Sequence, residues 1–315
     1  MYTSHFRLHE MPFGLTPDTS YFFASRHAQS ALNTLLVAAR SGEGFIKITG
    51  EVGTGKTLLC RKFMACVGDA FVIAYIPNPS MAPRTLLLAV ADELGLLFDS
   101  GAGHPVGAEV DQHRLLKALT ARLLALAGEG RRVLLCLDEA QAMPLETLEA
   151  IRLLTNLETE KRKLLQVVLF GQPELDAHLA VPGIRQLAQR ISFHYHLEPL
   201  QRADLAAYLA QRLRVAAAAG AADSSLFTAA AVSALYRASG GVPRLVNIVA
   251  HKALMLAYGL GRSTVELADV VGAARDTPGA RPPRWSLAEV LVRLFTPRLQ
   301  ASRQRTARWS RHERH

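Results

Sequence analysis

The sequence contains few cysteines. Only three occur among its 315 residues, at Cys60, Cys66 and Cys136, and no two of them form a C-x-x-C pair. A disulfide framework needs several paired cysteines, and structural zinc sites commonly use C-x-x-C pairs, so neither is expected to stabilise the chain. We therefore expect a reducing, cytoplasmic environment.

Long hydrophobic runs and a leader-like N-terminus are also absent. No apolar run reaches the ~18–20 residues of a membrane span, and no charged segment followed by an apolar one opens the chain. Half of the residues are nevertheless hydrophobic and only 20% are charged, which excludes wholesale disorder. The sequence predicts a folded chain that is soluble or at most peripheral to a membrane.

The positive charge is unevenly distributed along the chain. The formal net charge is +9, but nine arginines and two glutamates between 281 and 315 contribute +7 of it, leaving +2 for the rest. Apolar residues in this tail recur at helical spacing, and the 285–315 segment is therefore predicted to dock on an anionic membrane surface or a partner protein. A solvated terminus is the main alternative, and nucleic acid is the least favoured partner. The apolar positions are Leu287, Val290, Leu291, Leu294 and Phe295.

Short apolar runs alternate with helical patterns in the first two thirds of the chain. Runs of this kind occupy parallel strands that are covered on both faces, so the pattern predicts an α/β fold with five strands. The predicted strands are 45–49, 71–76, 133–137, 166–170 and 191–197, and helices are predicted at 56–66, 83–97 and 111–127, with a loop at 100–107.

From Pro199 the pattern becomes purely helical. Helices are predicted at 202–219, 225–239, 243–258 and 265–274. The chain is accordingly divided into an α/β nucleotide-binding domain (1–199, with the N-terminal segment), a helical lid domain (200–275), and a Pro-rich linker with the basic amphipathic tail (276–315).

A glycine-rich motif follows the first predicted strand. Residues 50–57 fit G-x-x-x-x-G-K-[ST] between a strand and a helix, the context in which backbone N–H groups and the helix N-terminus bind phosphates. Lys56 is predicted to reach the β and γ phosphates, and the Thr57 hydroxyl to bind Mg²⁺. The predicted ATP-binding residues are Gly50, Glu51, Val52, Gly53, Thr54, Gly55, Lys56, Thr57 and Leu58.

Two acidic residues end the third predicted strand. Asp138 is predicted to hold Mg²⁺, and Glu139 to polarise the water that attacks the γ-phosphate. Acids at a strand end are common by themselves. Their occurrence after a phosphate loop, in the right order, predicts ATP hydrolysis.

Two further polar residues are candidates for the same site. Gln172 follows the fourth strand and is predicted to orient the water, with a turn-forming glutamine before Pro173 as the alternative. Arg244 follows a Gly-Gly pair at a predicted helix start and is predicted to contact the γ-phosphate, with a solvated arginine as the alternative.

Arg185 and Arg190 lie on a polar segment, predicted to be helical, before the fifth strand. In ring-shaped ATPases this region faces the next subunit, so either residue is a candidate arginine finger in trans, with Arg190 preferred. Ordinary surface charge is the alternative for each.

Several motifs resemble the ExeA/GspA group of AAA+ secretion ATPases over roughly residues 1–275. They comprise the opening segment with its aromatic residues, the phosphate loop, and the motifs at 138–141, 170–175, 186–190 and 241–244. The likeness extends to ATPases of mannose-sensitive haemagglutinin (MSHA, type IV) pilus biogenesis over 31–36 and 41–50. It implies a P-loop AAA+ fold, with a parallel five-stranded αβα core and a small helical lid.

The resemblance also implies a biological role. A protein of this group would be an ATP-driven, ring-like homo-oligomer that works with pilus or type II secretion assembly proteins at the inner membrane. ExeA/GspA proteins continue into a membrane span and a periplasmic peptidoglycan-binding domain, whereas this sequence shows neither.

Two alternatives remain open. A DNA-binding AAA+ ATPase of the transposition-regulator type has the same core motifs, and a nucleotide-gated scaffold would need no turnover. The aromatic residues of the N-terminal segment are predicted to pack in the core, to form an adenine-side wall, or both. They are Tyr2, Phe6, Phe13, Tyr21, Phe22 and Phe23.

Overall fold

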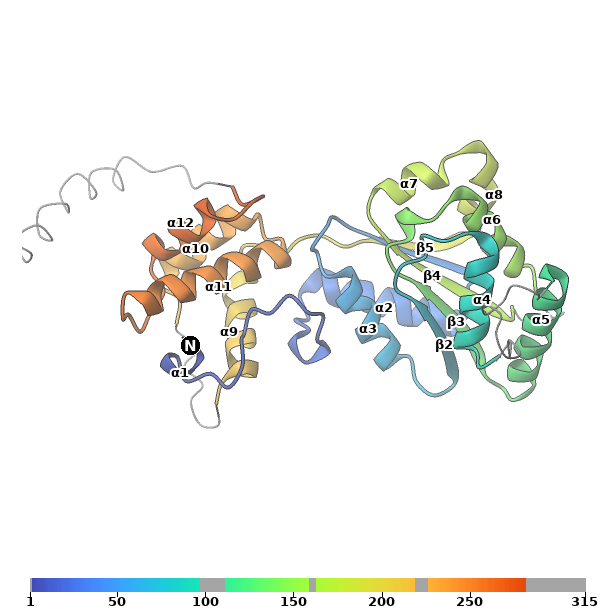
Figure 1. The fold of residues 1–315 in the computed structure, drawn as a ribbon, viewed down its shortest axis with the longest axis horizontal. Coiled ribbons are helices and arrows are strands. Elements are labelled where there is room, and N and C mark those ends of the chain that lie inside the picture. Colours follow the sequence, from blue (N-terminus) through green and yellow to red (C-terminus); the bar gives the residue numbers. More distant parts are fainter. Residues whose placement is uncertain (1, 97–110, 159–162, 219–225, 282–315) are drawn as a thin grey trace, which may run out of the picture.

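The protein consists of an α/β domain and a helical domain. The structure is a computed structural model that describes residues 2–96, 111–158, 163–218 and 226–281. The predicted loop at 100–107 and the basic tail at 285–315 lie outside the described residues. In Figure 1 the two domains lie side by side along the longest axis, and the N-terminus lies against the helical domain.

A single parallel sheet forms the centre of the α/β domain. Its order is β2-β3-β4-β1-β5, which places the first strand between the fourth and the fifth. The prediction of five parallel strands is confirmed. The strands are β1 (Phe45–Thr49), β2 (Phe71–Ile76), β3 (Arg132–Leu137), β4 (Leu165–Gly171) and β5 (Ile191–His196).

Helices cover both faces of this sheet. On one face α2 (Arg26–Ser41) and α3 (Lys56–Cys66) bury their apolar residues against alternate residues of the central strands, such as Ile46 and Ile48. On the other face lie α4 (Pro83–Glu93), α5 (Gln112–Gly128) and α6 (Leu145–Leu154). Because side chains alternate along a strand, covering both faces requires the nearly continuous apolar strands that the sequence contains.

Two of these helices were not predicted. The helix α2 begins at the N-cap Ser25, whose hydroxyl accepts from the N–H of Ala28, and ends at Gly42 with φ 82°. The helix α6 follows Pro144 and buries Leu148 and Ile151. Both segments contain apolar residues at helical spacing and ordinary helix start or stop signals, so both helices could have been predicted from the sequence.

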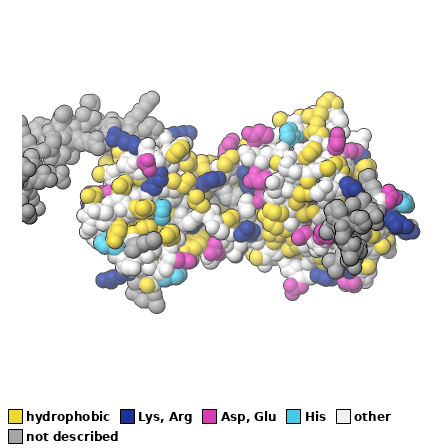
Figure 2. Space-filling model, viewed as in Figure 1, with side chains coloured by type: hydrophobic (Ala, Val, Ile, Leu, Met, Phe, Trp, Pro, Cys, Tyr) yellow, Lys and Arg dark blue, Asp and Glu magenta, His cyan; other side chains and the backbone are white. Residues whose placement is uncertain are grey.

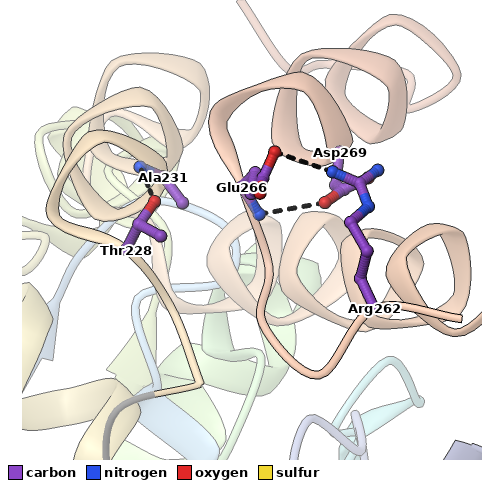
Figure 3. Close-up of polar contacts among 5 residues, drawn as sticks. All are labelled: Thr228, Ala231, Arg262, Glu266 and Asp269. Atoms are coloured by element: carbon purple, nitrogen blue, oxygen red, sulfur yellow. Dashed lines mark hydrogen bonds and ion pairs between the residues drawn. The ribbon is translucent and has the colours of Figure 1, made fainter. Parts of the chain in front are cut away.

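Among the described residues, four helices form the helical domain, and their caps explain why some predicted helices were too long. Thr228 caps α10 (Ala229–Ser239) by accepting from Ala231, so that helix begins four residues later than predicted. A reciprocal cap between Glu266 and Asp269 begins α12 (Leu267–Arg275), and Arg262 binds both carboxylates (Figure 3). The other two helices are α9 (Leu205–Ala216) and α11 (Pro243–Gly259).

The N-terminal segment, which the sequence pattern placed with the α/β domain, packs mainly on the helical domain, while Phe22 packs against the α/β core. Its short helices α1 (Tyr2–His5) and η1 (Thr19–Tyr21) contribute buried aromatic rings to the same apolar cluster as α9 to α12. Tyr2 is 5% exposed and hydrogen-bonds Nδ1 of His251 on α11. Packing of these aromatic side chains therefore contributes to the core of the helical domain.

Within the described ranges, no helix has the length and apolar character that crossing a bilayer requires. On the face shown in Figure 2, acidic and basic side chains are interspersed over both domains. This agrees with the nearly neutral charge of the chain outside its tail.

Candidate functional site

The phosphate loop connects β1 to α3 at the carboxyl edge of the sheet. Gly53 (φ 84°) and Gly55 (φ 99°) adopt left-handed conformations, which glycine reaches without the steric cost that other residues incur. Lys56 is 5% exposed, and its Nζ donates to the carbonyls of Gly50 (2.7 Å) and Glu51 (3.0 Å). The loop thus folds around the ammonium group.

Burial is the main influence on the charge of Lys56. It lowers the pKa of this ammonium group, whereas the nearby carboxylates of Glu139 and Asp138 oppose the decrease. An added anion close to Nζ would favour the charged form further. The site is therefore electrostatically suited to a phosphate group.

Asp138 follows β3 and lies next to the start of α3. It is 2% exposed, and burial raises its pKa, while hydrogen bonds from the Thr57 hydroxyl and the Glu139 N–H oppose the increase. The structure thus brings together the two residues predicted to bind magnesium. Hydroxyl and carboxylate oxygens are hard donors of the type that Mg²⁺ prefers, so this pair fits the ion.

Glu139 is held in place by two glutamine amides. Its backbone is left-handed (φ 53°), a conformation uncommon outside glycine. Its Oε2 accepts from Nε2 of Gln141 at 2.6 Å and from Nε2 of Gln172 at 3.2 Å. The Oε1 of Gln141 accepts from the N–H of Gln172 at 2.9 Å, so Gln141 connects the ends of β3 and β4. This network fixes the position of the Glu139 carboxylate.

A cavity of about 320 Å³ lies at the phosphate loop. The α/β domain, the N-terminal segment and the helical domain all contribute to its walls. Lining residues include Lys56, Thr57, Glu139 and Gln172 from the α/β domain, residues 14–17 from the N-terminal segment, and Tyr208, Arg212, Arg244 and Asn247 from the helical domain.

Arg244 lies where the helical domain contacts the phosphate loop. Its backbone N–H donates to the carbonyl of Gly53 at 3.2 Å. A Cβ atom at Gly53 would lie 2.6 Å from the Cβ of Arg244, so only glycine permits this approach. Arg244 thus lies beside the phosphate loop, and its contact with the γ-phosphate stays a prediction.

Arg185 and Arg190 lie away from this cavity. The polar segment after β4 is divided into the short helices α7 (Glu174–Leu179), η3 (Pro182–Ile184) and α8 (Arg185–Ala188). The prediction that both arginines are helical is wrong for Arg190, which follows α8 and precedes β5. Since β5 begins there, Arg190 lies at the amino edge of the sheet, opposite the phosphate loop, and Nη1 donates to Oδ1 of Asn156 at 2.5 Å.

Sequence reasoning assigned no role to several residues of the site. Gln141 lies three residues after Asp138, within a motif that carried the family resemblance. Tyr208 donates from its hydroxyl to Oδ1 of Asn247 at 2.8 Å, which joins α9 to α11 beside the cavity. No local motif marks Tyr208 or Asn247, because only the packing of the helical domain brings them to the site.

The fold and the site together define a P-loop nucleotide-binding protein of the AAA class. A family model described as "AAA domain" matches residues 39–179. General secretion pathway protein A of Aeromonas hydrophila is 42% identical over 281 residues, which cover 89% of this chain and 49% of the relative. The chain belongs to the AAA family of ExeA/GspA type. It spans about half the length of that curated relative.

Solved structures of other proteins share the fold. The ORC2 protein of Aeropyrum pernix superimposes with a TM-score of 0.62 at 20% identity, covering 86% of this chain and 72% of that one. Cdc6p of Pyrobaculum aerophilum gives 0.63 at 18% identity, with 84% and 70% covered. The RuvB branch migration motor of Thermotoga maritima gives 0.52 at 14% identity, with 81% and 70% covered. At these identities the likeness concerns the fold alone.

Proposed function

We propose that the chain binds and hydrolyses ATP with Mg²⁺ as the metal. One observation carries the proposal: the phosphate loop after β1 lies beside the Asp138–Glu139 pair after β3, with Glu139 held by two amides. A phosphate-binding loop alone would support binding only. A positioned carboxylate next to it supports hydrolysis.

The phosphate loop performs the binding. The backbone N–H groups of residues 50–58 and the N-terminus of α3 are suited to bind phosphate oxygens, and Lys56 adds a positive charge among them. ORC2 of Aeropyrum pernix, which has the same fold, was solved in ADPNP–ADP complexes. Its fold therefore accommodates an adenine nucleotide.

Thr57 and Asp138 would hold the metal through their oxygens. Bound Mg²⁺ would supply positive charge to the phosphates during their transfer to water. A hydrogen bond from the Thr57 hydroxyl to the buried Asp138 carboxylate keeps the two oxygens close together.

Glu139 is proposed to accept the proton of the attacking water. Gln172 donates to its Oε2, and so lies where it can also orient that water. Arg244 is proposed to contact the γ-phosphate from the helical domain. In this way the angle between the domains would respond to the nucleotide.

Arg185 and Arg190 are proposed to act on a neighbouring subunit. Arg185 is exposed and neither residue lines the cavity of its own chain, so a contact in trans requires a ring-like homo-oligomer. Hydrolysis would then be completed at the interface between two subunits.

The relationship to General secretion pathway protein A supports a role in secretion. We propose that the chain supports assembly of a type II secretion apparatus or an MSHA-like type IV pilus at the inner membrane. There it would cooperate with other assembly proteins, and residues 285–315 would bind an anionic surface. The likeness to ORC and RuvB concerns the fold alone and does not favour the DNA-binding alternative.

Phosphate release from ATP tests the hydrolysis directly. The full chain should release phosphate in a reaction that requires Mg²⁺, and its specific activity should rise with protein concentration because the site is completed between subunits. No release at any concentration would contradict hydrolysis. In cells lacking the chain, loss of exported enzymes would indicate type II secretion, whereas loss of surface pilin would indicate the pilus.

Gln141→Leu should lower kcat without abolishing nucleotide binding. The substitution removes the amide that holds Glu139 and leaves the N–H of Gln172 without its partner. A misplacement of about 1 Å can cost about 100-fold in rate, but Gln172 would still donate to Glu139, so we expect a smaller decrease of about 10-fold. Steady-state kinetics should show an unchanged KM for ATP, and a wild-type kcat would contradict the positioning role.

A further inference from the structure

A short strap of the N-terminal segment lines the cavity at the phosphate loop. We define it as residues 12–17 of the N-terminal segment, of which Gly14, Leu15, Thr16 and Pro17 line the cavity. Leu15 is 55% exposed and Val52 of the phosphate loop is 53% exposed, and both side chains line this cavity. Exposed apolar side chains at a cavity wall are suited to pack against a flat, partly apolar group such as a nucleoside base.

Arg212 of α9 holds one end of the strap. Its Nε donates to the carbonyl of Pro12 at 2.5 Å, and its Nη2 donates to the carbonyl of Gly14 at 3.2 Å. Its guanidinium lies 4.5 Å from the ring centroid of Tyr21, a cation–π contact, and Nη1 donates to the hydroxyl of Tyr208 at 3.3 Å. One side chain thus connects the strap, η1 and α9.

The environment of Arg212 is unusual for a charged residue. The Arg212 side chain is 5% exposed, and it takes part in none of the ion pairs found among the described residues. A buried cation is costly unless it is paired or hydrogen-bonded, and here carbonyl oxygens, a hydroxyl and aromatic faces compensate for it. A neutral apolar residue would pack at this position but could not fix the course of the strap.

Arg61 of α3 holds the other end. Its Nη1 donates to the carbonyl of Pro17 at 2.7 Å. The same helix begins with Lys56 and Thr57, which belong to the phosphate site. The strap is therefore attached to the helical domain through Arg212 and to the phosphate-loop helix through Arg61.

We infer that Arg212 and Arg61 are positioning residues that hold the strap over the nucleoside end of a bound nucleotide. The phosphate loop accounts for the triphosphate, and the strap with residues of α9 and α11 forms most of the wall that remains. The inference rests on the proposed binding of ATP, and it adds that affinity for the nucleoside depends on these two arginines.

Binding of ATP and of inorganic tripolyphosphate by the full chain tests this inference. Both ligands offer three phosphates, but only ATP has a nucleoside to contact the strap. Isothermal titration calorimetry in the presence of Mg²⁺ should show that Arg212→Gln weakens ATP binding about 10-fold. Arg61→Gln should weaken ATP binding about 3-fold, because its contact with the Pro17 carbonyl is exposed. Binding of tripolyphosphate should change less than 2-fold for both.

The matched control is Arg214→Gln, since Arg214 lies on the same helix with its side chain exposed. It should bind both ligands as the wild type does. Unchanged ATP binding by the Arg212 and Arg61 variants, or equal loss of both ligands, would overturn the inference. If Arg212→Gln fails to fold, Arg61→Gln alone decides the question. Wild-type protein that binds neither ligand would instead contradict the proposed function.

Discussion

Replacing Lys56 with alanine should abolish measurable ATP binding. The ammonium group is buried inside the phosphate loop, where we propose that it binds the β and γ phosphates. Charge-assisted contacts to phosphate are among the strongest polar interactions in proteins, so we expect the Kd to rise at least about 100-fold. Titration with a fluorescent ATP analogue measures this change directly.

A control separates this effect from a general loss of charge. Lys117→Ala removes an exposed lysine of α5 and should leave ATP binding unchanged. Circular dichroism should show that Lys56→Ala is folded, because the hydrogen bonds that it loses are confined to the phosphate loop. ATP binding by a folded Lys56→Ala protein at the wild-type Kd would mean that the phosphate loop is not the nucleotide site.

Glu139→Gln should bind ATP and hydrolyse it at least about 100-fold more slowly. The substitution preserves the size of the side chain but removes its ability to accept a proton from water, a contribution typically worth 10²–10⁴-fold. Asp138 and Thr57 are unaltered, so metal binding is expected to persist. Single-turnover measurement of phosphate release, with Kd measured in parallel, distinguishes slow chemistry from weak binding.

Glu146→Gln is the matched control for this variant. Glu146 is an exposed carboxylate in the first turn of α6, seven residues after Glu139, and its loss should not change the rate. Normal turnover by Glu139→Gln would show that another group accepts the proton. In that case Gln172 and Gln141 would position a Glu139 carboxylate that takes no part in catalysis.

The parts of the site predicted from sequence are those encoded locally. The phosphate loop needs eight consecutive residues and two flanking elements, and Asp138 and Glu139 directly follow an apolar strand. In a parallel sheet the carboxyl ends of all strands lie along one edge, so these motifs and Gln172 were expected to meet. Strand length and periodicity likewise sufficed to predict the parallel sheet.

Other features depend on packing between segments far apart in the chain. The contact between Arg212 and Pro12 joins residues 200 positions apart, and no local pattern indicates it. The aromatic residues of the N-terminal segment were recognised as candidates for the core, but their spacing does not specify which domain they join. Arg190 was assigned to a helix because its neighbours are polar and helical, whereas α8 ends at Ala188.

The position of β1 in the sheet limits how this protein can be shortened. The matched AAA domain ends at residue 179, before β5, yet β5 pairs with β1 along its whole length. A recombinant fragment cut at that boundary would leave the strand that precedes the phosphate loop as an open sheet edge. Unpaired N–H and C=O groups on such an edge promote self-association, so the fragment would be prone to aggregate. A recombinant fragment of residues 2–281 would retain every described element of both domains.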